Sequence, residues 1–501
     1  MMRLLTCRFW VTLSAVFLLG VLPAEGSLAS EDVQSELSPH GTLPLVGSYE
    51  IIDARTGELP NGLRYVILPR KSSEPGIGIE MYVEGGFIAE RRPGERGLVH
   101  FIEHMAFDGT TNIPPGQLLE IGMPVSFPAP SAGATDWRGS RYYFSSRTSE
   151  VKDIDTLLFI LREFASEQTF LPEAIERQRA DVLREMDEKK IGNHIYADLV
   201  AAVGPGTPTD LIDAQNSQDV ANAPIEVIEA LYRDLYHPVS TVISVVGDVD
   251  PDAVIALIED RFGDWRPEGT RREPSSEWEL EADKISNLSV AAEPRSRIGT
   301  ALSWSLPSSD TPRRRLVALD AALMEMLAVE ALSARFGAQY PDTDKSNLRV
   351  SIDDGTNGYR LILIVLVQPE RDWAALVSNL SELACSLHSR GFSPDEWRAA
   401  KASTLASLHD RARAVGSVTN VALAGQLANA HSRGIWVFSP SELLFHATKI
   451  FPDLDESRGN VWLRDRIISG VQHLRVETPA LSAYENPTEI VRKEFGSQSC
   501  E

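Results

Sequence analysis

The chain has 501 residues, of which 43% are apolar and 24% are charged. Such a length and composition are typical of roughly two to four folded domains, and they exclude a peptide hormone, a small disulfide scaffold and a largely disordered or coiled-coil chain. With 48 Lys and Arg against 71 Asp and Glu, the formal net charge is −23. An acidic surface repels phosphate backbones, so we expect no nucleic-acid partner. Three cysteines are too few for a disulfide framework.

The first 26 residues have the pattern of an export signal. Arg3 and Arg8 precede an apolar run at 9–23, and residues 24–26 place small side chains at the cleavage spacing. The alternative is a membrane anchor, but a spanning helix needs about 20 apolar residues and this run is shorter. We expect an exported protein, periplasmic or secreted, with no stable membrane insertion after the signal is cleaved.

A polar leader at 27–47 precedes a predicted N-terminal domain at 48–265. Alternating apolar residues predict strands with one buried face, and apolar residues at helical spacing predict helices that pack on them. In chain order the predicted elements are strands at 63–67 and 77–83, helices at 97–107, 151–166 and 173–190, a strand at 242–246 and a helix at 254–262.

Residues 266–288 are rich in charges, Pro and Gly, and we interpret them as an interdomain linker. A similar order of elements then recurs, with strands at 298–306, 347–353 and 359–367 and helices at 312–336, 371–389 and 394–413. The sequence therefore predicts an α+β fold of two similar domains, each with a mixed or antiparallel sheet packed with helices, the second at 289–501. This second domain has no recognisable metal motif, since its histidines are scattered at His388, His409, His431, His446 and His473.

The segment Gly-Leu-Val-His-Phe-Ile-Glu-His at 97–104 carries the chemistry. On a helix, His100 and His104 lie one turn apart on one face, so both imidazoles can reach a single zinc ion. Glu103 lies beside them and is suited to take a proton from a zinc-activated water as the general base of peptide hydrolysis. This H-x-x-E-H spacing is the inverse of the commoner H-E-x-x-H zinc signature.

A catalytic zinc site needs a third protein ligand, with water in the fourth position. The acidic helix at 173–188 offers three candidates on one face: Asp181, Glu185 and Glu188. Spacing alone does not choose among them.

Several segments together resemble one protein family. These are Leu-Pro-Asn-Gly-Leu at 59–63, the stretch from Gly97 to Thr110, Asp-Val-Leu-Arg-Glu-Met at 181–186, Tyr-His-Pro at 236–238, Val-Gly-Asp-Val at 246–249 and Phe-Gly-Asp-Trp at 262–265. They are similar to the pitrilysin/insulinase family of zinc metallopeptidases, which includes the mitochondrial processing peptidase. The resemblance is strong over 48–265 and extends over 290–450 only as a pattern.

The resemblance implies a role for each motif residue. His100, His104 and Glu185 would hold one zinc ion per chain, and Glu103 would be the general base. The chain would fold as one half of a clamshell peptidase. The distance of 81 positions from His104 to Glu185 is slightly longer than we expect for the family, and a loop at 124–131 can absorb the difference.

Two departures from the family pattern bear on the site. Gln178 stands seven residues before Glu185, where the family usually has an acid, so that charge is missing or supplied by Glu176. The strand that pairs with substrate in the family is altered here at 131–137. Strand addition depends chiefly on backbone groups, so we expect peptide binding to persist with a changed preference.

The sequence therefore predicts a zinc-dependent endopeptidase or oligopeptidase acting on peptides or unfolded segments. The alternative is a catalytically silent lobe that supports an active subunit, although such lobes typically lose part of the metal motif. A metal-storage protein is disfavoured because Glu103 would then have no role. Since the family encloses substrate between two lobes, we expect a homodimer or a heterodimer with a related lobe.

Overall fold

The computed structural model describes residues 54–71, 75–118, 132–136, 138–189, 216–272, 288–291, 297–307, 315–340, 348–354, 359–369 and 372–496. The predicted export signal at 1–26, the leader at 27–47, the loop at 124–131 and residues 273–287 of the predicted linker lie outside the described residues. The boundaries proposed for the two domains stay a prediction.

A six-stranded mixed sheet forms the centre of the first half, in the order β1-β2-β6-β3-β5-β4. Its strands are β1 (Arg55–Glu58), β2 (Arg64–Pro69), β3 (Ile77–Glu84), β4 (Gly133–Thr135), β5 (Gly139–Ser146) and β6 (Thr241–Gly247). β2 and β6 run parallel, and the other neighbours are antiparallel. β4 stands at one edge and pairs with β5 alone among the described strands.

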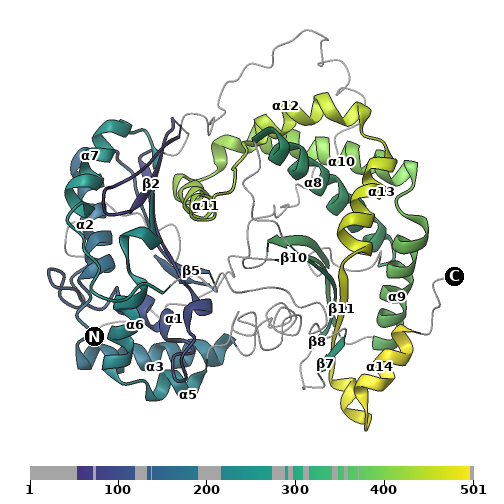
Figure 1. Ribbon diagram of the computed structural model, residues 1–501, viewed down its shortest axis with the longest axis horizontal. Coiled ribbons are helices and arrows are strands. Elements are labelled where there is room, and N and C mark those ends of the chain that lie inside the picture. The colour runs from purple at the N-terminus through teal and green to yellow at the C-terminus, as the bar shows by residue number, and fades with distance from the viewer. Residues whose placement is uncertain are drawn as a thin grey trace, which may run out of the picture.

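Helices cover one face of this sheet, as Figure 1 shows on its left side. They are α1 (Leu98–Met105), α2 (Val151–Ser166), α3 (Pro172–Lys189), α5 (Ser217–Asn222), α6 (Ile225–Leu235) and α7 (Pro251–Phe262). Ile77, Ile79 and Met81 alternate along β3 and are buried in the same apolar core as these helices. The predicted alternation of β3 is therefore confirmed, and its apolar face packs against the helices that carry the motif.

The other face of the first sheet is covered by a helix from far along the chain, α11 (Asn420–Ser432). Apolar residues of β2, β3 and β6 form a separate core with those of α11, which includes Val66, Tyr82, Leu423 and Leu427. Gly78 makes this packing possible, because a Cβ there would lie 2.1 Å from the backbone nitrogen of Val421. A segment of the second half thus completes the first half.

The second half contains a five-stranded sheet in the order β7-β11-β8-β10-β9. Its strands are β7 (Leu288–Ala291), β8 (Arg297–Pro307), β9 (Leu348–Asp354), β10 (Tyr359–Pro369) and β11 (Val471–Glu477). Its longer helices are α8 (Arg315–Ala338), α9 (Trp373–Arg390), α10 (Pro394–Arg413), α12 (Pro440–Ile450), α13 (Glu456–Leu463) and α14 (Pro487–Phe495). The predicted α+β architecture, with a sheet and packed helices in each half, is confirmed.

The cysteines contribute one disulfide bond to the described structure. Cys385 on α9 is disulfide-bonded, and the other two cysteines of the sequence, Cys7 and Cys500, lie outside the described residues. A single bond of this kind is not a disulfide framework, and the apolar cores account for the packing of the described residues.

Among the helices that the structure describes, none combines the length and apolar character that crossing a membrane requires.

Candidate metal centre

Helix α1 presents two histidines from one face. Its apolar residues, including Phe101 and Ile102, are fully buried against the first sheet and its helices. On the face of α1 opposite these apolar residues, His100 Nε2 and His104 Nε2 lie 3.2 Å apart, and the two rings are nearly perpendicular. Both side chains are largely buried, so their positions are set by the packing of α1.

Glu185 of α3 completes a triangle of donor atoms. Its Oε2 lies 3.5 Å from His100 Nε2 and 3.3 Å from His104 Nε2. Ligands about 2.0–2.1 Å from a tetrahedral zinc ion stand about 3.3–3.4 Å from one another. The spacing of the three donor atoms, 3.2 to 3.5 Å, therefore fits a zinc ion.

The other acids considered for the third ligand are placed differently. Asp181 is 40% exposed and pairs with Arg184 at 2.7 Å on the surface of α3. The side chain of Glu188 lies outside the part of the chain that the structure describes. Of the two candidates whose side chains the structure describes, Asp181 and Glu185, Glu185 is the one that lies beside the two histidines.

Glu103 is a second carboxylate at the same centre. Its side chain is 8% exposed, and its Oε2 lies 3.8 Å from His100 Nε2 and accepts a long hydrogen bond of 3.5 Å from Thr135 of β4. Gly133 leaves room for it, since a Cβ at that position would lie 2.1 Å from Glu103 Oε1. Glu103 is thus close enough to the two histidines to share an ion with them, although it lies slightly farther from His100 than Glu185 does.

The outer side of His104 contacts polar groups that do not include Glu176. His104 Nδ1 lies 3.1 Å from Gln178 Oε1, and Gln178 Nε2 donates to Asp108 at 2.9 Å. Glu176 is 71% exposed and pairs with Arg179 instead. Of the two alternatives drawn from the sequence, a missing charge or one supplied by Glu176, the structure does not support the second. The helical register turns Glu176 to solvent, and Asp108 supplies the nearby charge. Asp108 is not among the site residues predicted from the sequence, although it lies within the motif segment that ends at Thr110.

The electrostatics of the centre favour a positive charge. Burial lowers the pKa of His104, but the carboxylates of Glu185 and Glu103 and the amide of Gln178 outweigh it, so the net shift of this pKa is upward. The same carboxylates that stabilise a proton stabilise a metal ion, and the two compete for the imidazole.

The start of α1 is fixed by a second acid that was not predicted from the sequence, Glu90. Glu90 is buried, and its carboxylate accepts hydrogen bonds of 2.8 Å from the backbone amides of Gly97 and Val99. Burial raises the pKa of Glu90 to about 8, although these two hydrogen bonds oppose the shift. Glu90 thereby satisfies amides at the helix N-terminus that have no partner within the helix.

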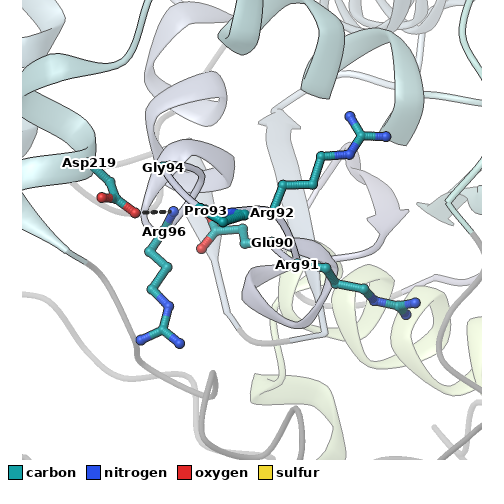
Figure 2. Close-up of a pocket in the computed structure, with 7 residues that line it drawn as sticks. All are labelled: Glu90, Arg91, Arg92, Pro93, Gly94, Arg96 and Asp219. Carbon is teal, nitrogen blue, oxygen red and sulfur yellow. Dashed lines mark hydrogen bonds between the residues drawn. The ribbon is translucent and has the colours of Figure 1, made fainter.

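A cavity of about 220 Å³ adjoins this turn and is lined by arginines, namely Arg91, Arg92 and Arg96, with Glu90, Pro93, Gly94 and Asp219. Figure 2 shows that the three guanidinium groups point in different directions. Arg92 is turned toward Glu95 and Asp234, with which it forms ion pairs of 3.9 and 3.6 Å. The arginines therefore do not converge on one anion.

Two family models match the sequence. The model described as "Insulinase (Peptidase family M16)" matches residues 65–201, and the model described as "Peptidase M16 inactive domain" matches residues 222–404. The first match contains every motif residue of the candidate metal centre.

Individual relatives agree with these models. The chain is 24% identical over 259 residues to "Probable zinc protease PqqL" of Escherichia coli, which is 50% of this chain and 27% of that protein. It is 27% identical over 215 residues to "Mitochondrial-processing peptidase subunit beta" of Blastocladiella emersonii, which is 41% of this chain and 43% of that protein. The match thus spans about a quarter of the length of the Escherichia coli protein.

The fold is shared with solved structures. The first half of the periplasmic protease PqqL from Escherichia coli superposes with a TM-score of 0.71 and 18% sequence identity, covering 90% of this chain and 98% of that one. The arrangement of both sheets and their helices therefore resembles that in one half of the Escherichia coli PqqL protease.

Proposed function

Because the chain belongs to the insulinase (M16) family of peptidases, we propose that it is a zinc-dependent endopeptidase or oligopeptidase. One observation carries the proposal: three donor atoms, from His100, His104 and Glu185, lie at the mutual distances of zinc ligands. These residues would hold one zinc ion per chain.

Glu103 is the group that moves protons in this proposal. A zinc ion held by His100, His104 and Glu185 would supply a Lewis acid that lowers the pKa of a bound water toward neutrality. Glu103 takes the proton of the attacking water and passes it to the leaving amine of the peptide. The contact with Thr135 and the absence of a side chain at Gly133 keep its carboxylate directed to the centre.

The edge strand β4 is the proposed substrate contact. It has one described neighbour, β5, and its residues Gly133 and Thr135 lie against Glu103. An extended peptide added along β4 would form backbone hydrogen bonds and lie beside the centre. Backbone recognition suits peptides and unfolded segments, because their backbone N–H and C=O groups are not already hydrogen-bonded within a fold.

The rival function is a silent lobe that supports an active partner. A silent lobe needs neither a base nor converging ligands, yet His100, Glu103, His104 and Glu185 are all present and lie together. A metal-storage role leaves Glu103 without a task. The arrangement therefore favours the peptidase.

We also propose an exported protein that works with a second lobe. The chain superposes on one half of the full PqqL protease, covering 50% of that structure. A homodimer, or a heterodimer with a related lobe, would enclose the centre and bury well over about 1,000 Å². Light scattering at micromolar concentration, run beside a cleavage assay, tests this. A strictly monomeric chain with full activity would contradict it.

The decisive experiment measures zinc and cleavage on the same protein. The chain lacking residues 1–26 should purify with about one zinc ion and cleave an unstructured peptide, and chelation should abolish cleavage. Full zinc occupancy without cleavage, alone or with a related lobe added, would favour the silent lobe. Absence of zinc would refute the metal centre itself.

A further inference from the structure

A line of polar side chains connects the candidate metal centre to the surface. His104 Nδ1, on the side of the ring away from Glu185, lies 3.1 Å from Gln178 Oε1. Gln178 Nε2 donates to Asp108 Oδ2 at 2.9 Å. Arg177 donates to both oxygens of Asp108, at 3.1 and 2.7 Å. The line thus runs from an imidazole through an amide and a carboxylate to a guanidinium.

The chemistry of these groups fixes the direction of each hydrogen bond. An ionised carboxylate only accepts, so the amide of Gln178 must turn its NH₂ toward Asp108 and its oxygen toward His104. An amide oxygen also only accepts. His104 must therefore carry a hydrogen on Nδ1. In the neutral imidazole the lone pair is then on Nε2, the atom that lies 3.2 Å from His100 Nε2 and 3.3 Å from Glu185 Oε2.

Asp108 is well placed to impose this direction. Its side chain is 10% exposed, and both of its oxygens accept hydrogen bonds from Arg177, which fix its orientation. Arg177 is 52% exposed, so the charged pair ends at the surface. Without a fixed acceptor at Asp108, either end of the Gln178 amide could face the ring.

We propose that Asp108 and Gln178 form a polar relay that holds His104 in the Nδ1–H form, with Asp108 acting through Gln178. In this arrangement the negative charge is that of Asp108, and the Gln178 side chain separates it from the His104 imidazole. An acid at position 178 would instead contact the imidazole directly. Both are positioning residues. Their value for metal binding depends on the proposed zinc function, but the hydrogen position on His104 does not.

A double-mutant cycle tests whether Asp108 acts through Gln178. Zinc affinity, measured by competition with a chelator, should fall about tenfold in Asp108→Ala and in Gln178→Met. In the Gln178→Met background, Asp108→Ala should cause no further loss, because there is no amide left to orient. Asp181→Ala is the matched control, since it removes an acid of α3 that pairs with Arg184. Losses that multiply in the double variant would overturn the relay.

A second measurement does not involve the metal. In the metal-free chain labelled with ¹⁵N-histidine, long-range ¹H–¹⁵N spectra at alkaline pH should show His104 as the Nδ1–H form. Both single variants should populate the Nε2–H form, and Asp181→Ala should not. An Nε2–H form in the unmodified chain would overturn the relay even if zinc binds. A relay seen in the spectra of a chain that binds no zinc would instead refute the proposed function alone.

Discussion

The two halves of the molecule repeat one sheet topology but differ in chemistry. In the first half the order β2-β6-β3-β5-β4 has one parallel pair, β2 and β6, followed by three antiparallel pairs. In the second half β7-β11-β8-β10-β9 has the same pattern, with β7 and β11 parallel. The connections therefore match strand by strand, apart from the additional edge strand β1.

The helices that follow corresponding strands carry different residues. α1 follows β3 and contributes His100 and His104, whereas α8 follows β8 and contains no histidine. In the described part of the second half, no three His, Cys, Asp or Glu side chains lie close enough to share an ion. The comparison shows that the fold supplies a scaffold, and that a few side chains on it determine the chemistry.

The sharpest test of this difference is Glu103→Gln. If the first half alone is catalytic, this change should lower cleavage by about 10²–10⁴-fold while zinc remains bound, because the base is lost and the ligands are kept. Glu330→Gln on α8 is the matched change in the second half and should leave cleavage unchanged. Kinetics and zinc content of both variants check the prediction. Joint loss of zinc and activity in Glu103→Gln would make Glu103 a ligand.

The histidines allow a similar comparison at the level of metal binding. His100→Ala should reduce zinc affinity by at least about 100-fold, since two ligands hold the ion poorly. His388→Ala on α9, an exposed histidine of the second half, should have no effect. Metal analysis after dialysis against a weak chelator measures both. Full zinc occupancy in His100→Ala would refute the ligand assignment.

The contact between the halves should respond to pH through Glu80. This residue of β3 is buried beneath α11, where a Cβ on Gly425 would lie 2.5 Å from Glu80 Oε2. Burial raises the pKa of Glu80 from 4.5 to about 7, although Arg141 opposes the shift. A raised carboxyl pKa means that the folded chain holds a proton which the unfolded chain releases. Its contribution to stability is therefore lost as the pH rises from about 4.5 to 7.

We expect Glu80→Gln to increase the free energy of unfolding at pH 8 by about 2 kcal/mol and to change it little at pH 5. Denaturant unfolding at the two pH values measures the difference. An equal effect at both would show that Glu80 is not protonated in the folded chain at pH 5.

The smallest effect concerns an ion pair in the second half. Arg335 of α8 donates to both oxygens of Glu396 at 2.6 Å, and these bonds lower the pKa of Glu396 to about 2 against the opposing effect of burial. A depressed carboxyl pKa stabilises the fold above about pH 4.5, and this stabilisation is lost as the pH falls toward 2. Since the pair is partly screened by water, Arg335→Ala should cost about 1 kcal/mol at pH 7. This loss in the free energy of unfolding should become smaller toward pH 2. Unfolding curves at both pH values measure it, and an equal loss at both would show that the ion pair does not contribute.

Local patterns in the sequence determined the elements and the start of the site. The alternation at 77–83 predicted β3 because a strand with one buried face imposes a period of two. Ser393 and Glu396 form a capping box at the start of α10, which begins at residue 394 as the sequence predicted. His100, Glu103 and His104 belong to a single helix of eight residues, so their proximity follows from helical geometry.

The tertiary structure decided what local patterns cannot encode. β5 was not predicted, because its sequence Gly-Ser-Arg-Tyr-Tyr-Phe-Ser-Ser does not alternate between apolar and polar residues. In the structure, Ser side chains are buried on both faces of this strand. The packing of α11 on the first sheet joins residues more than 300 positions apart. Glu185 meets the histidines, and Gln178 meets Asp108, because α3 docks on α1 at one rotation and offset. That docking depends on the shapes of two buried helix faces together, and no single stretch of sequence contains both.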